Sequence, residues 1–155
     1  MKVPLILVVG GLVTLTAFGC TTSRTSTEAP AGTSQSTTAP STQEAEQAKS
    51  DAMSDIRKAQ IESDIRAREQ RNQITGGDAD RADADLESEV RGKLETNIPA
   101  GQLTVDAKEG VVTVTGTVPA EDQIAKVDQL PLEIKGVKQV VNQVVVAAAT
   151  PKPSK

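Results

Sequence analysis

Gly-Val-Val-Thr-Val-Thr-Gly-Thr-Val at residues 110–118 and Gly-Val-Lys-Gln-Val-Val-Asn at residues 136–142 decide the fold of this 155-residue chain. Both stretches are rich in β-branched residues and begin at a glycine, a pattern typical of strands that follow turns. The residues between them, 119–135, carry apolar side chains at helical spacing. The sequence therefore predicts strand, helix, strand, with the helix as a right-handed crossover over one face of a sheet.

A further helix is predicted upstream of this unit. Between Asp83 and Asn97, the residues Leu86, Val90 and Leu94 recur at i, i+4 and i+8 and so share one helical face. Acidic residues crowd the first turns of this segment, where the helix dipole favours negative charge. We therefore expect an amphipathic helix that packs its apolar face on the sheet.

A β-hairpin is predicted between that helix and the crossover unit. Apolar and polar residues alternate over 103–108, and Glu109 with Gly110 supplies a turn, because glycine adopts positive φ at no steric cost. The predicted fold class is α+β, in the order α-β-β-α-β, with two helices on a mixed three-stranded sheet. The predicted core consists of Leu86, Val90, Leu94, Leu103, Val105, Val112, Val114, Val118, Ile124, Val127, Ile134, Val137 and Val140.

This arrangement over residues 83–147 resembles the BON domain, a family found in bacterial cell-envelope proteins. The resemblance rests on Gly110 with Val111 and Val112, on the block Val114-Thr115-Gly116-Thr117-Val118, and on Gly136 and Val137 with Val140 and Asn142. It implies an envelope location and a role in binding phospholipid or attaching to membranes, and it implies no catalytic chemistry. Gly116 and Gly136 are expected to matter as backbone positions rather than as ligands.

Pro131 interrupts the second predicted helix. Proline removes a backbone donor and crowds the carbonyl four residues earlier, at a cost of roughly 3 kcal/mol in a helix interior. We therefore expect a break or kink near Leu130. Beyond it, Leu132 points away from the core and is a candidate lipid or partner contact, although it could also be a satellite packing residue.

Residues 1–19 are predicted to be a lipoprotein signal peptide. The largely apolar run over 3–19 is slightly short for a membrane-spanning helix, which needs about 20 apolar residues. Ala17-Phe18-Gly19-Cys20 resembles a bacterial lipobox, in which the cysteine carries diacylglycerol, although Ala17 and Phe18 depart from the usual form. Cys20 is the only cysteine and is the predicted lipidation site. An uncleaved anchor or an ordinary secretory signal is the alternative.

The middle of the chain is predicted to keep the domain away from the membrane. Residues 20–42 are dominated by Thr, Ser, Pro, Ala and Gly and are predicted to form a disordered tether. Residues 43–75 are rich in good helix formers and follow a capping box at Ser41 and Glu44, so an exposed spacer helix is predicted. An apolar stripe that could instead dock on a partner or on the domain consists of Met53, Ile56, Ile61 and Ile65. The remaining predicted parts are a hinge at 76–82 and a disordered tail at 148–155.

The composition excludes several classes of function. Phe18 is the only aromatic residue and histidine is absent, so the chain lacks stacking platforms for single-stranded nucleic acid and the residues of ordinary zinc sites or Ser-His nucleophiles. Asp78, Asp80 and Glu89 have the spacing of calcium-loop ligands, but Asp83 stands where that loop needs glycine. We therefore predict no enzyme, no metal and no cofactor other than the lipid on Cys20.

The predicted function is that of a non-enzymatic envelope lipoprotein. Because Thr21 is not aspartate, the enteric sorting rule would place it on the periplasmic face of the outer membrane. Its BON-like domain would bind phospholipid or attach to membrane surfaces, in envelope integrity or osmotic stress. The chain's 17 basic and 21 acidic residues show no basic cluster to support this, so phospholipid binding is implied by the resemblance alone. The alternative is a protein-interaction module that meets an envelope partner through its sheet edge or through the helix at 44–73.

Overall fold

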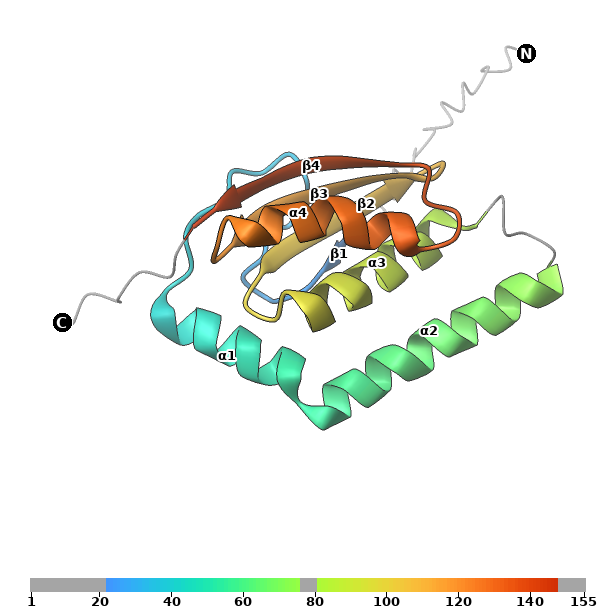
Figure 1. Ribbon diagram of the computed structural model, residues 1–155, viewed down its shortest axis with the longest axis horizontal. Helices are drawn as coiled ribbons and strands as arrows, with labels where there is room; N and C mark the ends of the chain where they lie inside the picture. The colour runs from blue at the N-terminus through green and yellow to red at the C-terminus, as the bar shows by residue number, and fades with distance from the viewer. Residues whose placement is uncertain (1–21, 76–80, 148–155) are drawn as a thin grey trace, which may run out of the picture.

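The computed structural model describes residues 22–75 and 81–147 (Figure 1). The predicted signal peptide at 1–19, the lipidation site Cys20, most of the hinge at 76–82 and the tail at 148–155 lie outside these residues. The predictions made for them therefore stay predictions.

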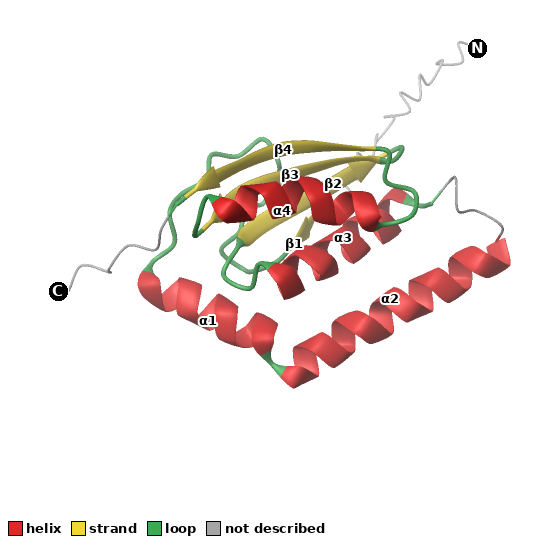
Figure 2. Ribbon diagram, viewed as in Figure 1, coloured by secondary structure: helices red, strands yellow, loops and turns green. Residues whose placement is uncertain are grey.

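The described chain forms an α+β fold around one mixed sheet. The strands β2 (Gln102–Lys108) and β3 (Val111–Val118) are antiparallel, β3 and β4 (Gln139–Val146) are parallel, and the order is β1-β2-β3-β4. Helices α3 (Asp83–Asn97) and α4 (Asp122–Gln129) cover one face of this sheet (Figure 2). The prediction of α+β is confirmed, but the sheet has four strands rather than three, because β1 (Ser23–Arg24) joins it from the segment predicted to be a tether.

The hairpin between β2 and β3 turns at the two predicted residues. Lys108 pairs with Val111, and Glu109 and Gly110 between them have φ of 53° and 85°. Positive φ at both positions is the geometry of a type I′ turn, whose twist matches that of the flanking strands.

The crossover from β3 to β4 contains the break that Pro131 predicts. Helix α4 ends at Gln129, and the chain continues as a 3-10 helix, η1 (Leu130–Glu133), with Pro131 in its first turn. Pro131 is buried there, whereas Leu132 is 54% exposed.

The core lies between the sheet and the two helices, largely as predicted. Ile124, Ile134 and Val137 pack against it while only partly buried, and Val140 is not a member, because its edge strand has a neighbour on one side only. The sequence analysis missed Ile98 and Ala107. The buried residues of the core are Leu86, Val90, Leu94, Ile98, Leu103, Val105, Ala107, Val112, Val114, Val118 and Val127.

Residues 22–41 differ from the predicted tether. Beyond β1, the backbone N–H of Thr25 donates to the carbonyl of Leu103 at 2.8 Å, and Thr104 on the other sheet face donates its hydroxyl to the carbonyl of Pro30. Ala29 is buried at 4% exposure. The low apolar content that predicted disorder is offset here by hydrogen bonds to a sheet face that is itself rich in threonine.

The predicted spacer helix is two helices, α1 (Thr42–Met53) and α2 (Asp55–Thr75), which we call the helical arm. The capping box is present: Ser41 accepts from the N–H of Glu44, and the Glu44 carboxylate accepts from the N–H of Ser41 at 2.8 Å. Between the helices, Ser54 leaves helical geometry with ψ of 139°, and its hydroxyl accepts the N–H of Arg57 at 3.2 Å. Ser54 therefore ends one helix and caps the next.

The helical arm packs on α3 instead of standing in solvent. Ile61 is 4% exposed and lies over Gly92, where an added Cβ would come within 2.8 Å of its Cγ2 atom. The other residues of the predicted stripe contribute less, since Met53 is 50% and Ile56 84% exposed and Ile65 is half-buried. A glycine in the middle of a helix thus serves as the docking point for one isoleucine.

Replacing Gly92 with alanine is expected to have opposite effects in two backgrounds. In an Ile61→Ala protein it should stabilise by about 1 kcal/mol, because alanine favours helix over glycine by that amount. With Ile61 present, the methyl collides with a stiff β-branched side chain, so the same change should destabilise by about 1 kcal/mol. Urea unfolding of the four proteins of this double-mutant cycle measures the coupling. Equal effects in both backgrounds would show that the arm is not docked at this point.

Candidate functional site

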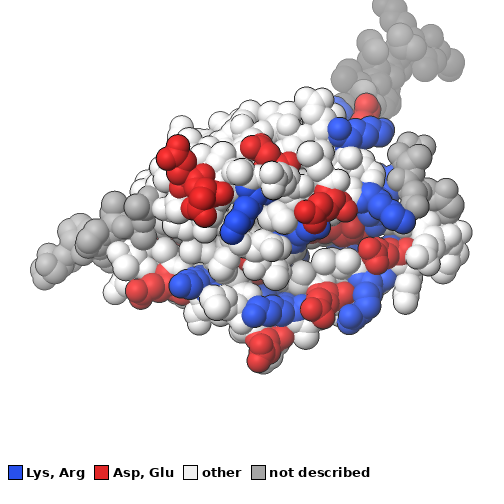
Figure 3. All heavy atoms as spheres, in the orientation of Figure 1, with Lys and Arg blue, Asp and Glu red and all other residues white. Residues whose placement is uncertain are grey.

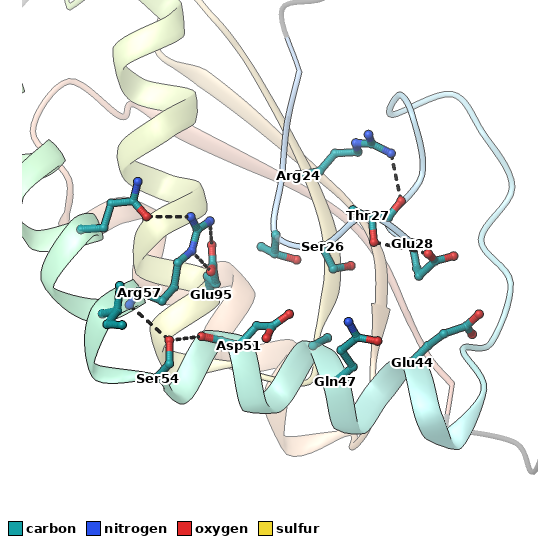
Figure 4. A pocket seen from close by; sticks show the side chains of 14 residues that line it. Arg24, Ser26, Thr27, Glu28, Glu44, Gln47, Asp51, Ser54, Arg57 and Glu95 are labelled. Carbon is teal, nitrogen blue, oxygen red and sulfur yellow. Dashed lines mark hydrogen bonds and ion pairs between the residues drawn. The ribbon is translucent and has the colours of Figure 1, made fainter.

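A polar groove of about 670 Å³ lies between the segment after β1, the helical arm and the end of α3 (Figure 4). Its charged lining residues are Arg24, Glu28, Glu44, Asp51, Arg57 and Glu95. Several of these groups already hold the fold together, since Glu44 closes the capping box and Arg57 binds Glu95. The groove is therefore the seam along which the arm meets the domain, and its chemistry is that of ion pairs rather than of a reaction centre.

Glu95 is the central carboxylate of this seam. It is 4% exposed and accepts two bonds from Arg57, at 2.6 and 3.0 Å, and a third from Arg91 at 2.7 Å. The hydrogen bond with Glu95 raises the pKa of Arg57, whereas burial lowers that of Arg91. A bidentate pair of this kind fixes orientation as well as distance, so Arg57 sets how α2 lies on α3.

A second ion pair joins Arg81, just before α3, to Glu89 in the middle of that helix. Arg81 and Glu89 have side chains only 3% and 4% exposed, and Arg81 also donates to the backbone carbonyl of Lys135 at 2.9 Å. Burial raises the pKa of Glu89, and the charge of Arg81 opposes that rise. Arg81 thereby links the start of the domain to the loop that leads into β4.

Glu87 is a buried carboxylate that forms no ion pair within residues 22–75 and 81–147. It is 3% exposed, and its Oε1 atom accepts the N–H of Ala107 at 3.3 Å. Burial raises the pKa of Glu87 to about 7; the Ala107 N–H opposes this rise, and the charges of Asp106 and Asp83 add to it. Glu87 therefore titrates near neutral pH inside the interface between α3 and β2.

Glu87 should make the stability of the protein fall as the pH rises from 4.5 to about 7. Its pKa is raised from 4.5 to about 7 in the folded protein, so over this range the unfolded chain loses the proton of Glu87 while the folded protein keeps it. Glu87→Gln removes that titration and keeps an acceptor for Ala107. The variant should match the wild type near pH 4 and be more stable by roughly 2–3 kcal/mol at pH 8. Urea unfolding across this range measures the difference. A difference that does not change with pH would mean that Glu87 ionises normally.

The residues that carry the family resemblance lie in turns and strands and do not line the polar groove. Gly110, Gly116 and Gly136 have φ of 85°, 131° and 95°, in the region that favours glycine. Val112 and Val118 are fully buried, and Val137 packs partly buried against the same core. Gly110 and Gly136 lie side by side, since an added Cβ at Gly110 would come within 2.8 Å of the Gly136 carbonyl oxygen, whereas Gly116 and Val118 lie toward the other end of β3.

Asn142 joins the edge strand to α4. Its side-chain amide donates to Asp128 at 2.9 Å, and its oxygen accepts the N–H of Val144 at 2.9 Å. The side chain thus satisfies one backbone donor on the strand that ends the sheet.

Sequence reasoning missed the buried charges on α3. The helix dipole accounts for negative charge in the first turns but does not predict burial, and Glu87 and Glu89 are both buried. One signal was available for Glu87, which precedes Val90 by three residues and Leu94 by seven and so falls on the apolar face. No comparable signal marks Arg81 and Glu89 as partners.

Neither a metal site nor a membrane span is found in the described part of the chain. Within residues 22–75 and 81–147, no three acidic, histidine or cysteine residues gather in a way that could hold a metal ion. No helix in the same ranges is both long and apolar enough to cross a bilayer.

The comparison with protein families bears on the part of the chain built around β2, β3 and β4. Residues 82–148 match the family model of the BON domain. The chain carries a BON domain. BON domains are associated with phospholipid binding in general and are binding modules rather than catalytic ones. No curated protein matches the chain at a significant level.

Proposed function

We propose that this protein is a lipid-anchored envelope protein whose BON domain associates with phospholipid membranes. The observation that carries the proposal is the match of residues 82–148 to the BON domain. The largely apolar run over 3–19 that closes at Cys20 supports an acyl anchor. Leu132, 54% exposed on η1, offers the domain an apolar side chain for the membrane surface.

Acylation of Cys20 would place the protein on the membrane without help from the domain. Each buried CH₂ contributes about 0.8 kcal/mol, and two or more chains make the attachment lasting. Thr21 after the cysteine supports the periplasmic face of the outer membrane, where a role in envelope integrity or osmotic stress would be exercised.

Two measurements test the two parts of this proposal. Fractionation of cells should keep the full chain in the membrane through a high-salt wash that releases its Cys20→Ser variant, because salt weakens contacts between charges and leaves an acyl anchor in place; a wild type released by the same wash would contradict the anchor. Purified Cys20→Ser protein, which has no acyl chain, should sediment with anionic phospholipid vesicles, and Leu132→Ser should weaken that binding. Failure to sediment with either anionic or zwitterionic vesicles at any salt concentration would contradict membrane association by the domain.

A protein partner is the second candidate, and the edge of the sheet favours it. Strand β4 ends the sheet, and Val145 and Val146 near its end are 47% and 46% exposed. An edge strand presents backbone groups that a strand of another protein can pair with. A photoreactive residue at Val145 should then crosslink an envelope protein that the same residue at Glu121, just before α4, does not. Crosslinks at neither position would count against this candidate.

A further inference from the structure

The place where the chain joins the sheet limits how far the domain can stand from its predicted anchor. Strand β1 begins at Ser23, three residues after Cys20. A chain spans at most about 3.3–3.6 Å per residue, so these three steps reach no more than roughly 11 Å. A disordered tether over 20–42 would have reached much further.

Several hydrogen bonds hold the chain to the sheet at β1 and directly after it. Ser23 and Arg24 pair with Val105 and Thr104, and the hydroxyl of Thr25 donates to the carbonyl of Gly101 at 2.9 Å. The same hydroxyl accepts the N–H of Leu103 at 2.9 Å. The attachment of the chain to the sheet is thus part of the fold.

The direction of β1 decides which end of the domain lies nearest the anchor. Because β1 is antiparallel to β2, the chain enters where β2 ends, beside the turn at residues 109–110 (Figure 1). We call this the hairpin end. The loop before β4 belongs to it, since the N–H of Lys138 donates to the carbonyl of Gly110 at 2.8 Å. So does the start of α3, where Asp83 accepts the N–H of Glu109 at 2.8 Å.

The two ends of the sheet differ in charge. Lys108, Lys135 and Lys138 are exposed at the hairpin end, together with the acidic Glu109, and the acidic Asp83 is half-buried there. The opposite end, where α4 begins, exposes the acidic pair Glu121 and Asp122. Figure 3 shows basic side chains with an acidic one among them beside the point where the chain enters, and acidic side chains over the beginning of α4. An anionic surface would therefore repel the far end more than the hairpin end.

We propose that the hairpin end faces the bilayer that holds Cys20, with Lys108, Lys135 and Lys138 against the phosphates of its lipid head groups. The inference rests on the proposed acylation of Cys20. The short segment between Cys20 and β1 keeps these lysines at a high effective concentration near the head groups, so weak contacts suffice to orient the domain. Glu109 and Asp83 offset part of the positive charge. The orientation follows from the chain path and the charge asymmetry together.

The test compares two positions at opposite ends of the full acylated chain on vesicles that contain anionic phospholipid. Gln139→Cys at the hairpin end and Glu121→Cys at the far end, both exposed, carry the same fluorophore. Lipids with a quencher in the head group should quench the probe at 139 at least threefold more than the probe at 121. Equal quenching, or stronger quenching at 121, would overturn the proposal.

Lengthening the segment between Cys20 and β1 gives the matched control. Ten Gly/Ser residues inserted between Thr21 and Thr22 leave the folded part unchanged and should reduce the quenching ratio toward one. If the insertion leaves the ratio of quenching at 139 to quenching at 121 unchanged, the short segment between Cys20 and β1 does not set the orientation. Sedimentation of the same samples separates the two proposals: protein that stays off the vesicles contradicts the acyl anchor, whereas bound protein with equal quenching contradicts only the orientation.

Discussion

Replacing Glu89 with alanine is expected to destabilise the protein by about 3–5 kcal/mol. The change leaves Arg81, whose side chain is 3% exposed, as a buried charge without its carboxylate partner. It should also loosen the loop before β4, because Arg81 donates to the carbonyl of Lys135 at 2.9 Å. Urea unfolding at pH 7 measures the loss, which is a large share of the stability of a small domain.

Two comparisons show whether burial is the cause. Glu62→Ala breaks an ion pair with Arg66 whose side chains are 70% and 66% exposed, and it should cost no more than about 0.5 kcal/mol. The double variant Arg81→Met with Glu89→Leu should recover most of the loss, because burial already raises the pKa of Glu89 and an apolar pair avoids that cost. A Glu89→Ala protein as stable as the Glu62→Ala protein would contradict the buried pair.

The sheet and its helices could be predicted because short-range patterns determine them. Valines alternate with threonines along β3, and Gly110 marks the turn before it. Helix α4 ends at Gln129, close to the break that the missing N–H of Pro131 predicts. Each of these signals acts within a few residues of the structure it produces. The fold class therefore followed from local sequence, and so did the core, except at Ile98, Ala107 and Val140.

The packing of the N-terminal third could not be predicted in the same way. The bond from Thr104 to the carbonyl of Pro30 joins residues 74 positions apart, and Arg57 meets Glu95 across 38. Polar composition predicts disorder or solvation when no partner is known, and the partners here are side chains of distant elements. Ile61 illustrates the limit: its stripe could be recognised, but only the close approach at Gly92 decides that it docks.

Replacing Gly116 with alanine is expected to destabilise the protein about as much as breaking the buried ion pair. Gly116 has φ of 131°, and an added Cβ would lie 2.0 Å from the carbonyl oxygen of Gln102 on β2. Neither strand can move away without breaking the pairing of Leu103 with Gly116. Backbone strain and the overlap each cost about 1–3 kcal/mol, so we expect a loss of about 2–6 kcal/mol.

Thermal unfolding gives the clearest readout of Gly116→Ala. For a domain of this size, 1 kcal/mol shifts Tm by about 4–8 °C, so Tm should fall by about 8 °C or more. Gly32→Ala is the matched control, because an added Cβ there meets nothing within 4 Å and its φ requires no glycine. It should leave Tm within about 2 °C of the wild type. Equal Tm values for the two variants would mean that β2 and β3 do not approach each other as closely as the pairing of Leu103 with Gly116 requires, and the alignment of β2 on β3 would then have to be revised.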